Sequence, residues 1–204
     1  MHGLLISQMD PPVELDDEFH TWYDTEHIPV RLALSGFGSA VRYRATENAT
    51  RFLVCYFIDN LDVLESDAYE RIKSQPGPRT ERMLGVVRDF TRFTCEMVND
   101  TGEQSPSYHG PSDHVIVHVS HCLPGATEKH ERREAARAEF LVESDHRWQR
   151  VRSYRTFGAN VGGPWTHISI HEVSRPISGP SPVLGSSGVE QEQCWNYEVI
   201  RRSR

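Results

Sequence analysis

The order of secondary-structure elements repeats along this chain of 204 residues. The first half predicts strand, helix, strand, strand, helix and strand, because apolar β-rich runs alternate with amphipathic runs. These elements are expected at residues 4–9, 16–34, 37–44, 51–58, 61–73 and 88–98. A polar, turn-rich linker at residues 100–113 follows, and the same order then begins again.

The second copy is shorter than the first. Strands are expected at residues 114–121, 148–157, 165–171 and 194–201, with a helix at 128–143. Residues 174–188 are rich in Pro, Ser and Gly, so the second helix of this copy is predicted to be missing. Two βαββαβ-type units, residues 1–99 and 114–204, give two antiparallel sheets with helices on one face of each. Packing the bare faces together gives a sandwich or barrel with an enclosed centre that can hold a small ligand.

The composition and charge argue against several kinds of binding partner for this protein. A net charge of −7 argues against non-specific binding to nucleic acid or to an anionic membrane. No apolar run is long enough for a membrane span, and the N-terminal run is too short for a secretory signal. The four cysteines are widely spaced without a C-x-x-C pair, which indicates reduced, mostly buried thiols in a cytoplasmic protein.

The segment from residue 19 to 31 carries the first candidate site. At about 100° per residue, His20, Asp24, His27 and Arg31 fall within about 60° of one another on a helix. This line borders an aromatic stripe that includes Tyr23, so its members are expected to be half-desolvated. Burial and neighbouring charge shift pKa values most at such borders. The alternative interpretation is a solvated helix edge.

Histidines on two strands of the second half suggest a further cluster. Period-two alternation places His114 and His118 on one face of their strand, and His167 and His171 with Trp165 on one face of theirs. The opposite faces are valine and isoleucine and are expected to lie beneath a helix. The histidines are therefore expected to face the barrel interior, unless the loss of a helix leaves this sheet exposed.

Metal binding is not predicted from these histidines. Positions i and i+4 on a strand lie about 13 Å apart at ~3.3 Å per residue, whereas zinc ligands lie only ~2 Å from the ion. His118 and His167 could approach across strands, but no Asp, Glu or Cys set is evident beside them in the sequence. The sequence predicts no metal site and no cofactor.

A family resemblance rests on an aromatic and basic pattern in the first half. The pattern is Phe19, Trp22-Tyr23, His27, Pro29 and Arg31, followed by Gly36-Phe37 and Arg42-Tyr43. It resembles the dimeric α+β barrel superfamily near its EthD-like members, specifically over residues 3–98 and only in architecture over residues 112–202. Members usually carry one ferredoxin-like unit per chain and dimerise sheet to sheet. The resemblance therefore implies an α+β fold of two tandem ferredoxin-like units forming an intramolecular pseudo-dimeric barrel, in which a monomer suffices and further oligomerisation stays open.

The resemblance also implies chemistry. In the superfamily the helix histidine at the position of His27 often lines the pocket, and some isomerases have a spacing like that of His20 and His27. Cofactor-free members act as polyketide cyclases, lactone isomerases and decarboxylases, whereas other members bind haem and several have no established activity.

The leading hypothesis is a cofactor-independent lyase, isomerase or cyclase of secondary metabolism that acts on an aromatic or polyketide-like small molecule. Histidine can accept or donate a proton near pH 7, so His27 is expected to be the main acid–base group, assisted by His20 and Tyr23. Substrate contacts are expected from Asp24, Arg31, Arg42, His118, Trp165 and His167. The alternatives are a haem-binding or haem-dependent barrel and a non-catalytic small-ligand binding protein.

Overall fold

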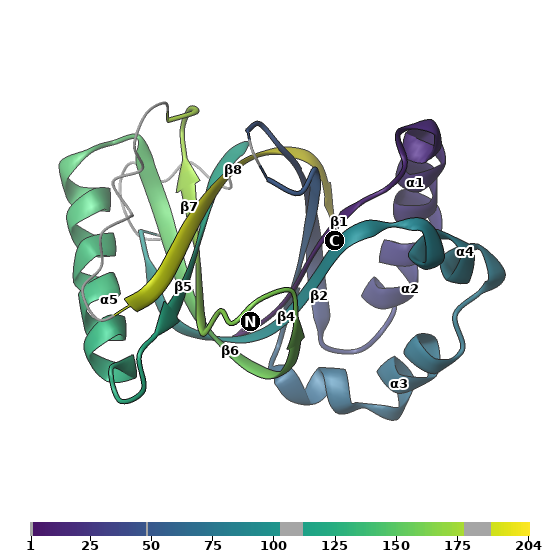
Figure 1. Ribbon diagram of the computed structural model, residues 1–204, viewed down its shortest axis with the longest axis horizontal. Helices are drawn as coiled ribbons and strands as arrows, with labels where there is room; N and C mark the ends of the chain where they lie inside the picture. Colours follow the sequence, from purple (N-terminus) through teal and green to yellow (C-terminus); the bar gives the residue numbers. More distant parts are fainter. Residues whose placement is uncertain (1, 48, 103–111, 178–188) are drawn as a thin grey trace.

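Eight antiparallel strands form a closed barrel in the computed structural model, which describes residues 2–47, 49–102, 112–177 and 189–204. Around the barrel the strand order is β1-β3-β2-β8-β5-β7-β6-β4, and β4 pairs with β1 to close it. Figure 1 shows the barrel between two sets of helices. Closure matters because it leaves no unpaired strand edge along the barrel wall.

The elements have the following bounds. The strands are β1 Gly3–Asp10, β2 Phe37–Ala45, β3 Phe52–Ile58, β4 Arg88–Thr101, β5 His114–Cys122, β6 Trp148–Val161, β7 His167–Val173 and β8 Val189–Ser203. The α-helices are α1 Asp16–Trp22, α2 Ile28–Leu32, α3 Asp67–Ser74, α4 Pro78–Val86 and α5 Thr127–Ser144. Short 3₁₀ turns cover Val13–Leu15 and Leu61–Glu65, and a π-helical turn covers Tyr23–His27.

Both halves of the chain have the same internal strand order. The first half is arranged β4-β1-β3-β2 and the second β8-β5-β7-β6. Two seams join the halves, β2 with β8 and β4 with β6, both antiparallel. The predicted α+β barrel is therefore confirmed.

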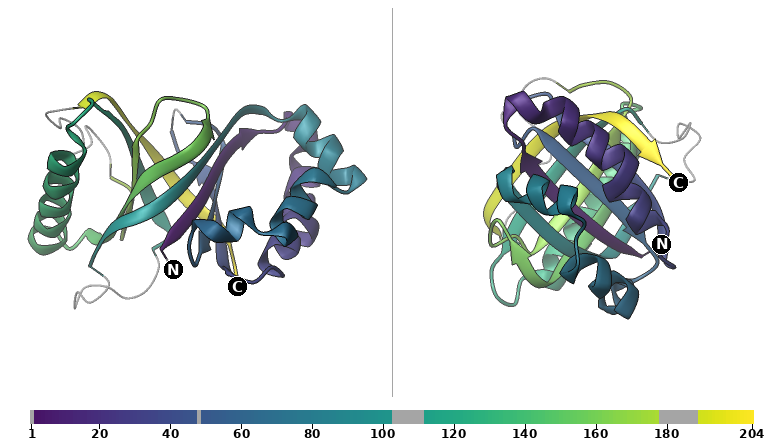
Figure 2. Two further views of the ribbon diagram at one scale, coloured as in Figure 1. Left: turned by 90° about the horizontal axis from the view of Figure 1, so that it is seen from below. Right: turned by 90° about the vertical axis from the view of Figure 1, so that its right-hand side faces the viewer.

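Three apolar clusters hold the fold together. One fills the barrel and draws on strands of both halves, with Leu4, Cys55, Val117 and Ile170 among its members. A second lies between the first-half strands and α1–α4, and a third lies between the second-half strands and α5. Figure 2 shows these helical layers on opposite sides of the barrel. The strands β1, β3, β5 and β7 are therefore buried on both faces. No helix in the described part of the chain is both long enough and apolar enough to span a membrane.

The single helix predicted at residues 61–73 is wrong. Ser66 has an extended backbone, and its hydroxyl accepts a hydrogen bond from the Tyr69 N–H, so α3 begins there as a new helix. A further helix, α4, was not predicted. Pro78 occupies the first turn of α4, where a missing N–H costs no hydrogen bond.

The helix expected at residues 16–34 is interrupted by the π-helical turn. Regular α-helix ends at Trp22, and α2 begins at Ile28 with Pro29 in its first turn. The predicted absence of a second helix in the second half falls mainly on residues 178–188, which lie outside the described residues.

Candidate functional site

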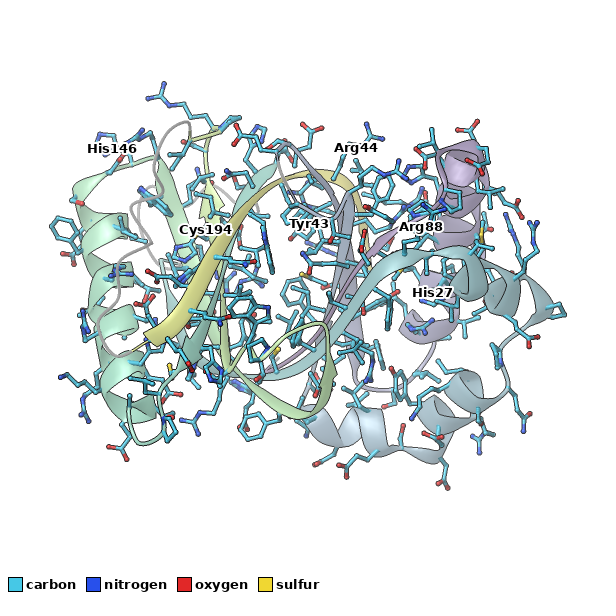
Figure 3. All side chains as sticks on the ribbon, in the orientation of Figure 1. His27, Tyr43, Arg44, Arg88, His146 and Cys194 are labelled. Atoms are coloured by element: carbon cyan, nitrogen blue, oxygen red, sulfur yellow. The ribbon has the colours of Figure 1, made fainter. Side chains whose placement is uncertain are left out.

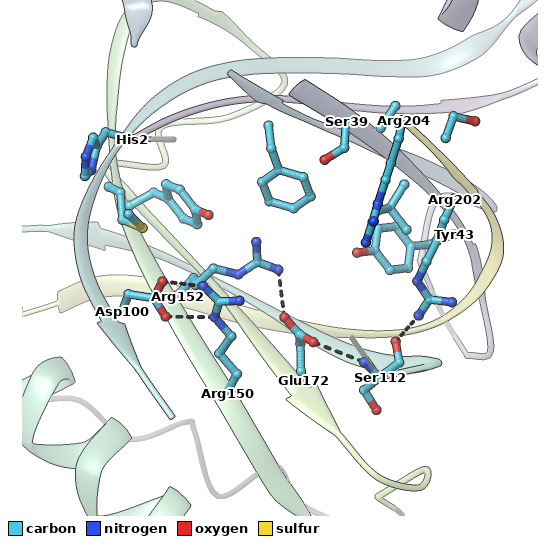
Figure 4. Close-up of a pocket in the computed structure, with 16 residues that line it drawn as sticks. His2, Ser39, Tyr43, Asp100, Ser112, Arg150, Arg152, Glu172, Arg202 and Arg204 are labelled. Atoms are coloured by element: carbon cyan, nitrogen blue, oxygen red, sulfur yellow. Dashed lines mark hydrogen bonds and ion pairs between the residues drawn. The ribbon is translucent and has the colours of Figure 1, made fainter. Parts of the chain in front are cut away.

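A cavity of about 510 Å³ opens at one end of the barrel and is lined by residues from both halves of the chain (Figure 4). Its aromatic walls are Tyr43 from β2, Phe57 from β3 and Tyr154 from β6. Its charged lining is Asp100, Arg150, Arg152, Glu172, Arg202 and Arg204. The cavity therefore combines flat apolar surfaces with a local excess of positive charge.

A buried ion pair lies at the charged side of this cavity. The Arg152 Nη2 donates to Glu172 Oε1 at 2.8 Å, and the Ser112 backbone N–H donates to Glu172 Oε2 at 3.1 Å. The Arg152 guanidinium lies 4.4 Å from the centre of the Phe57 ring, a cation–π contact. Its Nε is buried and has no hydrogen-bond partner among the residues that the structure describes. One side of the guanidinium is thus left without an acceptor.

Two further arginines form ion pairs at the rim. The Arg150 guanidinium binds the Asp100 carboxylate through Nε at 2.9 Å and Nη2 at 2.6 Å. The Arg202 guanidinium donates to Asp113 Oδ1 at 2.9 Å and to the Ser112 carbonyl at 2.6 Å. These contacts fix the positively charged groups around the opening.

The tyrosine hydroxyl groups are the proton donors of the cavity. Burial raises the pKa of Tyr43 well above 10, and the nearby Cys55 thiol adds to the effect. Burial also raises the pKa of Tyr154, against the charge of Arg152. Both phenols therefore keep their protons at neutral pH and can donate to a bound molecule.

Some of the side chains predicted to form a site along the helix edge do meet, but they meet on the outer face of the sheet, which the helices cover. Arg42 donates through Nη1 to Asp24 Oδ1 at 2.7 Å, and its Nη2 lies 2.6 Å from His20 Nδ1. Because arginine has no acceptor, this His20 nitrogen accepts the bond and carries no proton. Burial and then the Arg42 charge lower the pKa of His20. The Tyr23 ring lies 4.6 Å from the Arg42 guanidinium.

His27 and Arg31 do not join this group. The His27 ring packs on Trp22 and Tyr23 with centroid distances of 4.3 and 4.8 Å, and its Nδ1 is buried without a partner. Burial lowers the pKa of His27 well below 6.5. Arg31 donates to the His27 carbonyl at 3.0 Å. Figure 3 shows His27 among the helices, at a distance from Tyr43 in the barrel.

A narrow hollow adjoins the predicted helix edge. The hollow bounded by Tyr23, Arg42 and Phe52 has no volume for a bound molecule, and none of the predicted site residues lines the barrel cavity. The catalytic roles of His27, His20 and Tyr23 stay predictions, as do the substrate contacts of Asp24, Arg31 and Arg42.

The predicted direction of the second-half histidines is wrong. His118, His167 and His171 lie between the sheet and α5, whereas the valine face of β5 and the isoleucine face of β7 fill the barrel. The physical reason is that α5 turns polar groups toward the sheet. Glu134 lies 3.9 Å from His118 Nδ1, and Glu131 lies 3.2 Å from His167 Nε2. On the barrel side, the valine and isoleucine faces of these two strands belong to the apolar cluster that fills the barrel.

Trp165 does face the barrel, but from the other end. It lines a wide, open hollow of about 560 Å³ together with Trp195, Gln8 and Thr91. This second opening has no ion pair comparable to that of Arg152 and Glu172 among its described lining residues.

The haem alternative gains no support from the histidine positions. A haem iron takes its axial ligand from a side chain such as histidine that faces the porphyrin. Among the described residues that line the barrel cavity, the only histidine is His2, an exposed residue at the rim. His118 and His167 lie beneath α5, beside a space of only about 10 Å³.

The sequence interpretation missed the residues that line this cavity. A usable signal was present on β6, where Arg150, Arg152 and Tyr154 alternate along one face of a predicted strand. Glu172 was a second signal, since this charged residue directly follows an apolar β-rich run.

Comparison with known proteins supports the fold. No family model matches this sequence, and no curated protein is detectably related to it. An anthrone oxidase-like protein superposes with a TM-score of 0.70 at 12% identity, over 98% of this chain and 92% of its own. A candidate monooxygenase from Fusobacterium nucleatum gives 0.61 at 5% identity, over 98% and 93%. A chlorite dismutase mutant from Candidatus Nitrospira defluvii gives 0.51 at 9% identity, over 85% and 76%. At these identities the likeness is one of fold alone.

Proposed function

We propose that this chain is a cofactor-independent acid–base enzyme of the lyase, isomerase or cyclase type that acts on a small aromatic or polyketide-like molecule in the barrel cavity. The observation that carries the proposal is the buried Arg152–Glu172 pair in a cavity of about 510 Å³ whose walls include Tyr43 and Tyr154. Cavities of a few hundred Å³ with apolar walls and a few convergent polar groups are typical ligand sites.

Binding would depend on the aromatic walls and the arginines. A flat, partly apolar molecule can stack against Tyr43, Phe57 and Tyr154, which line the cavity. Arg150, Arg152 and Arg202 favour a substrate that carries a carboxylate, phenolate or enolate oxygen. The ligand class is therefore an acidic aromatic or polyketide-like compound.

Proton transfer would use the groups at the charged side. The Glu172 carboxylate accepts a proton from an acidic C–H or O–H of the substrate, and the electron pair moves onto a substrate oxygen. Arg152 and the tyrosine hydroxyls stabilise the resulting oxyanion. Return of the proton to another atom completes an isomerisation, and attack of the enolate carbon on a carbonyl completes a ring closure.

The domain organisation supports a single shared site. We propose that residues 1–99 and 114–204 are two tandem ferredoxin-like units joined by the linker 100–113, as the repeated strand order suggests. The first unit supplies Tyr43 and Phe57, and the second supplies Arg152, Tyr154 and Glu172. One chain would then complete its own barrel and its own active site, and the EthD-like assignment stays part of this proposal.

A second candidate function is a cofactor-free oxygenase. It is favoured by the fold similarity to an anthrone oxidase-like protein and to candidate monooxygenases. The same bound enolate would then give its electrons to dioxygen, which serves as the oxidant. Oxygen consumption in step with substrate loss supports this candidate, and turnover without oxygen uptake supports the acid–base enzyme.

The test is a screen of hydroxylated aromatic acids and polyketide-type phenols, with the native protein and a Glu172→Gln variant. We expect the substitution to lower turnover by about 10²–10⁴-fold while substrate still binds, since it removes the base and keeps the shape. The exposed Glu143 supplies the matched control, Glu143→Gln, which should leave turnover unchanged. Turnover of the Glu172→Gln variant at the native rate would contradict the proposal, and a ligand that binds and leaves unchanged would indicate a carrier protein instead.

A further inference from the structure

Three metal-ligating side chains from three elements meet beneath the start of α5. Cys122 ends β5, His130 lies in the first turn of α5, and His167 begins β7. One ligand atom from each lies within 4.8 Å of the other two, and each residue is at most 6% exposed. The Cys122 Sγ lies 3.3 Å from His167 Nδ1, and the two imidazole rings are 4.8 Å apart. This cluster is separate from the barrel cavity.

The surroundings of His167 orient it toward the thiol. Its Nε2 lies 3.2 Å from Glu131 Oε1, and Glu131 is itself held by Arg155 through two hydrogen bonds of 2.7 Å. A proton on Nε2 satisfies the carboxylate and leaves the Nδ1 lone pair directed at Cys122. A histidine that binds metal through one nitrogen and a carboxylate through the other is the usual arrangement in zinc sites.

The ligand spacing suits a tetrahedral ion. With Zn–S near 2.3 Å and Zn–N near 2.0–2.1 Å, ligand atoms around tetrahedral zinc lie roughly 3.3–3.6 Å apart. The 3.3 Å between Cys122 and His167 already meets this spacing, and small side-chain rotations would close the wider distances. A space of about 10 Å³ lined by His130, Glu131 and His167 could hold one water as a fourth ligand.

We propose that Cys122, His130 and His167 form a binding site for a zinc-like divalent transition metal, with Glu131 as the positioning residue for His167. One thiolate and two imidazoles are the donor set that zinc and cobalt prefer over magnesium or calcium. Without metal, the Thr166 hydroxyl lies 2.9 Å from His167 Nδ1 and satisfies that nitrogen. The metal must therefore displace this hydrogen bond. The site ties α5 to both strands beneath it, independently of the chemistry in the barrel.

The test is a titration of metal-free full-length protein with Co²⁺, followed by competition with Zn²⁺. We expect one equivalent of Co²⁺ to give the visible bands of a tetrahedral site and a near-ultraviolet thiolate-to-cobalt band, both removed by one equivalent of Zn²⁺. Cys122→Ser should lose the thiolate band. The half-buried Cys194 on β8 supplies the matched control, Cys194→Ser, which should keep it.

Glu131→Gln separates the positioning role from simple packing. It should weaken Co²⁺ binding by about 10–100-fold and keep the thiolate band, because the metal ligands remain. If Cys122→Ser fails to fold by circular dichroism, His130→Gln decides, and it should abolish stoichiometric binding. Absence of cobalt bands in the native protein, or the same bands and affinity in folded Cys122→Ser or His130→Gln, would overturn the proposal.

Discussion

At the scale of the residue, Arg152 and Glu172 stabilise each other because both are largely removed from water, with side chains 13% and 4% exposed. Removing one member of such a pair leaves an uncompensated buried charge. Glu172→Gln should therefore lower the free energy of unfolding by about 3 kcal/mol, although the amide has nearly the same shape. Urea denaturation measures the change. Glu143→Gln should change it by less than about 0.5 kcal/mol, and a similarly small change for Glu172→Gln would show that the pair is not formed.

His27 allows the helix-edge hypothesis to be tested directly. Its ring lies among aromatic side chains with an unpartnered Nδ1, so His27→Phe removes a buried unsatisfied group, which costs about 1–3 kcal/mol, and keeps the ring packing. We expect equal or greater thermal stability and native turnover of whichever substrate the screen identifies. A folded variant that loses turnover by a hundredfold would instead restore His27 as the acid–base group predicted from the sequence.

The sequence could not show which strand side chains face the barrel and which face a helix. Alternation correctly divided β5 into a valine face and a histidine face, but both faces are buried, so hydrophobicity could not tell the barrel from the helix side. The deciding fact is that α5 turns Glu131 and Glu134 toward the sheet, which becomes visible only once the helix is docked. The grouping of His20, Asp24 and Arg42 was within reach because two of them share a helix face.

At the scale of the element, the turn from α2 into β2 depends on Gly36. Its φ is +87°, and a Cβ there would lie 2.4 Å from Val63 Cγ2. Gly36→Ala should therefore lower the free energy of unfolding by more than about 1 kcal/mol, since the strained backbone and the contact add. Gly85 in α4 is the matched control, because a Cβ there meets nothing within 4 Å. Gly85→Ala should raise stability by about 0.5–1 kcal/mol, and equal effects at the two positions would refute this account.

Element existence was predicted more reliably than element boundaries. The strands were found because apolar β-rich runs are locally encoded, whereas the true end of β8 was missed because its polar flanks become strand only by pairing with β2 and β5. The missed helix α4 shows why Pro is ambiguous in a sequence. The same residue ends one helix or begins the next, depending on whether the backbone before it is extended, as it is at Gly77.

At the scale of the whole molecule, buried neutral histidines should make stability depend on pH. Burial lowers the pKa of His27 and His171 well below 6.5, and that of His130 to about 4. The unfolded chain takes up protons at these residues as pH falls through 6.5, whereas the folded chain does not. Their contribution is complete above pH 6.5 and is lost as pH falls toward about 4.

The slope of the free energy of unfolding against pH can be measured by urea denaturation between pH 7 and 4.5. Each histidine that stays neutral in the folded protein lowers the free energy of unfolding by about 1.4 kcal/mol for every pH unit below the pKa that it has in the unfolded chain. His27→Phe should reduce the slope by nearly the contribution of one histidine. A slope unchanged by this variant would mean that His27 titrates normally in the folded protein.

Barrel closure also sets the order in which the chain can fold as it is synthesised. The seam between β2 and β8 joins segments that are far apart in the sequence. Beside it, the Thr46 hydroxyl donates a hydrogen bond to the carbonyl of Asn196, 150 residues further along the chain. At a synthesis rate of about 5–20 residues per second, roughly 8–30 s pass on the ribosome before the partner strand of β2 has been made. During that interval the β2 edge stays unpaired, whereas the β4 edge is covered as soon as β6 has been made and docked. The nascent chain therefore keeps one open strand edge, and with it a risk of aggregation, until β8 emerges.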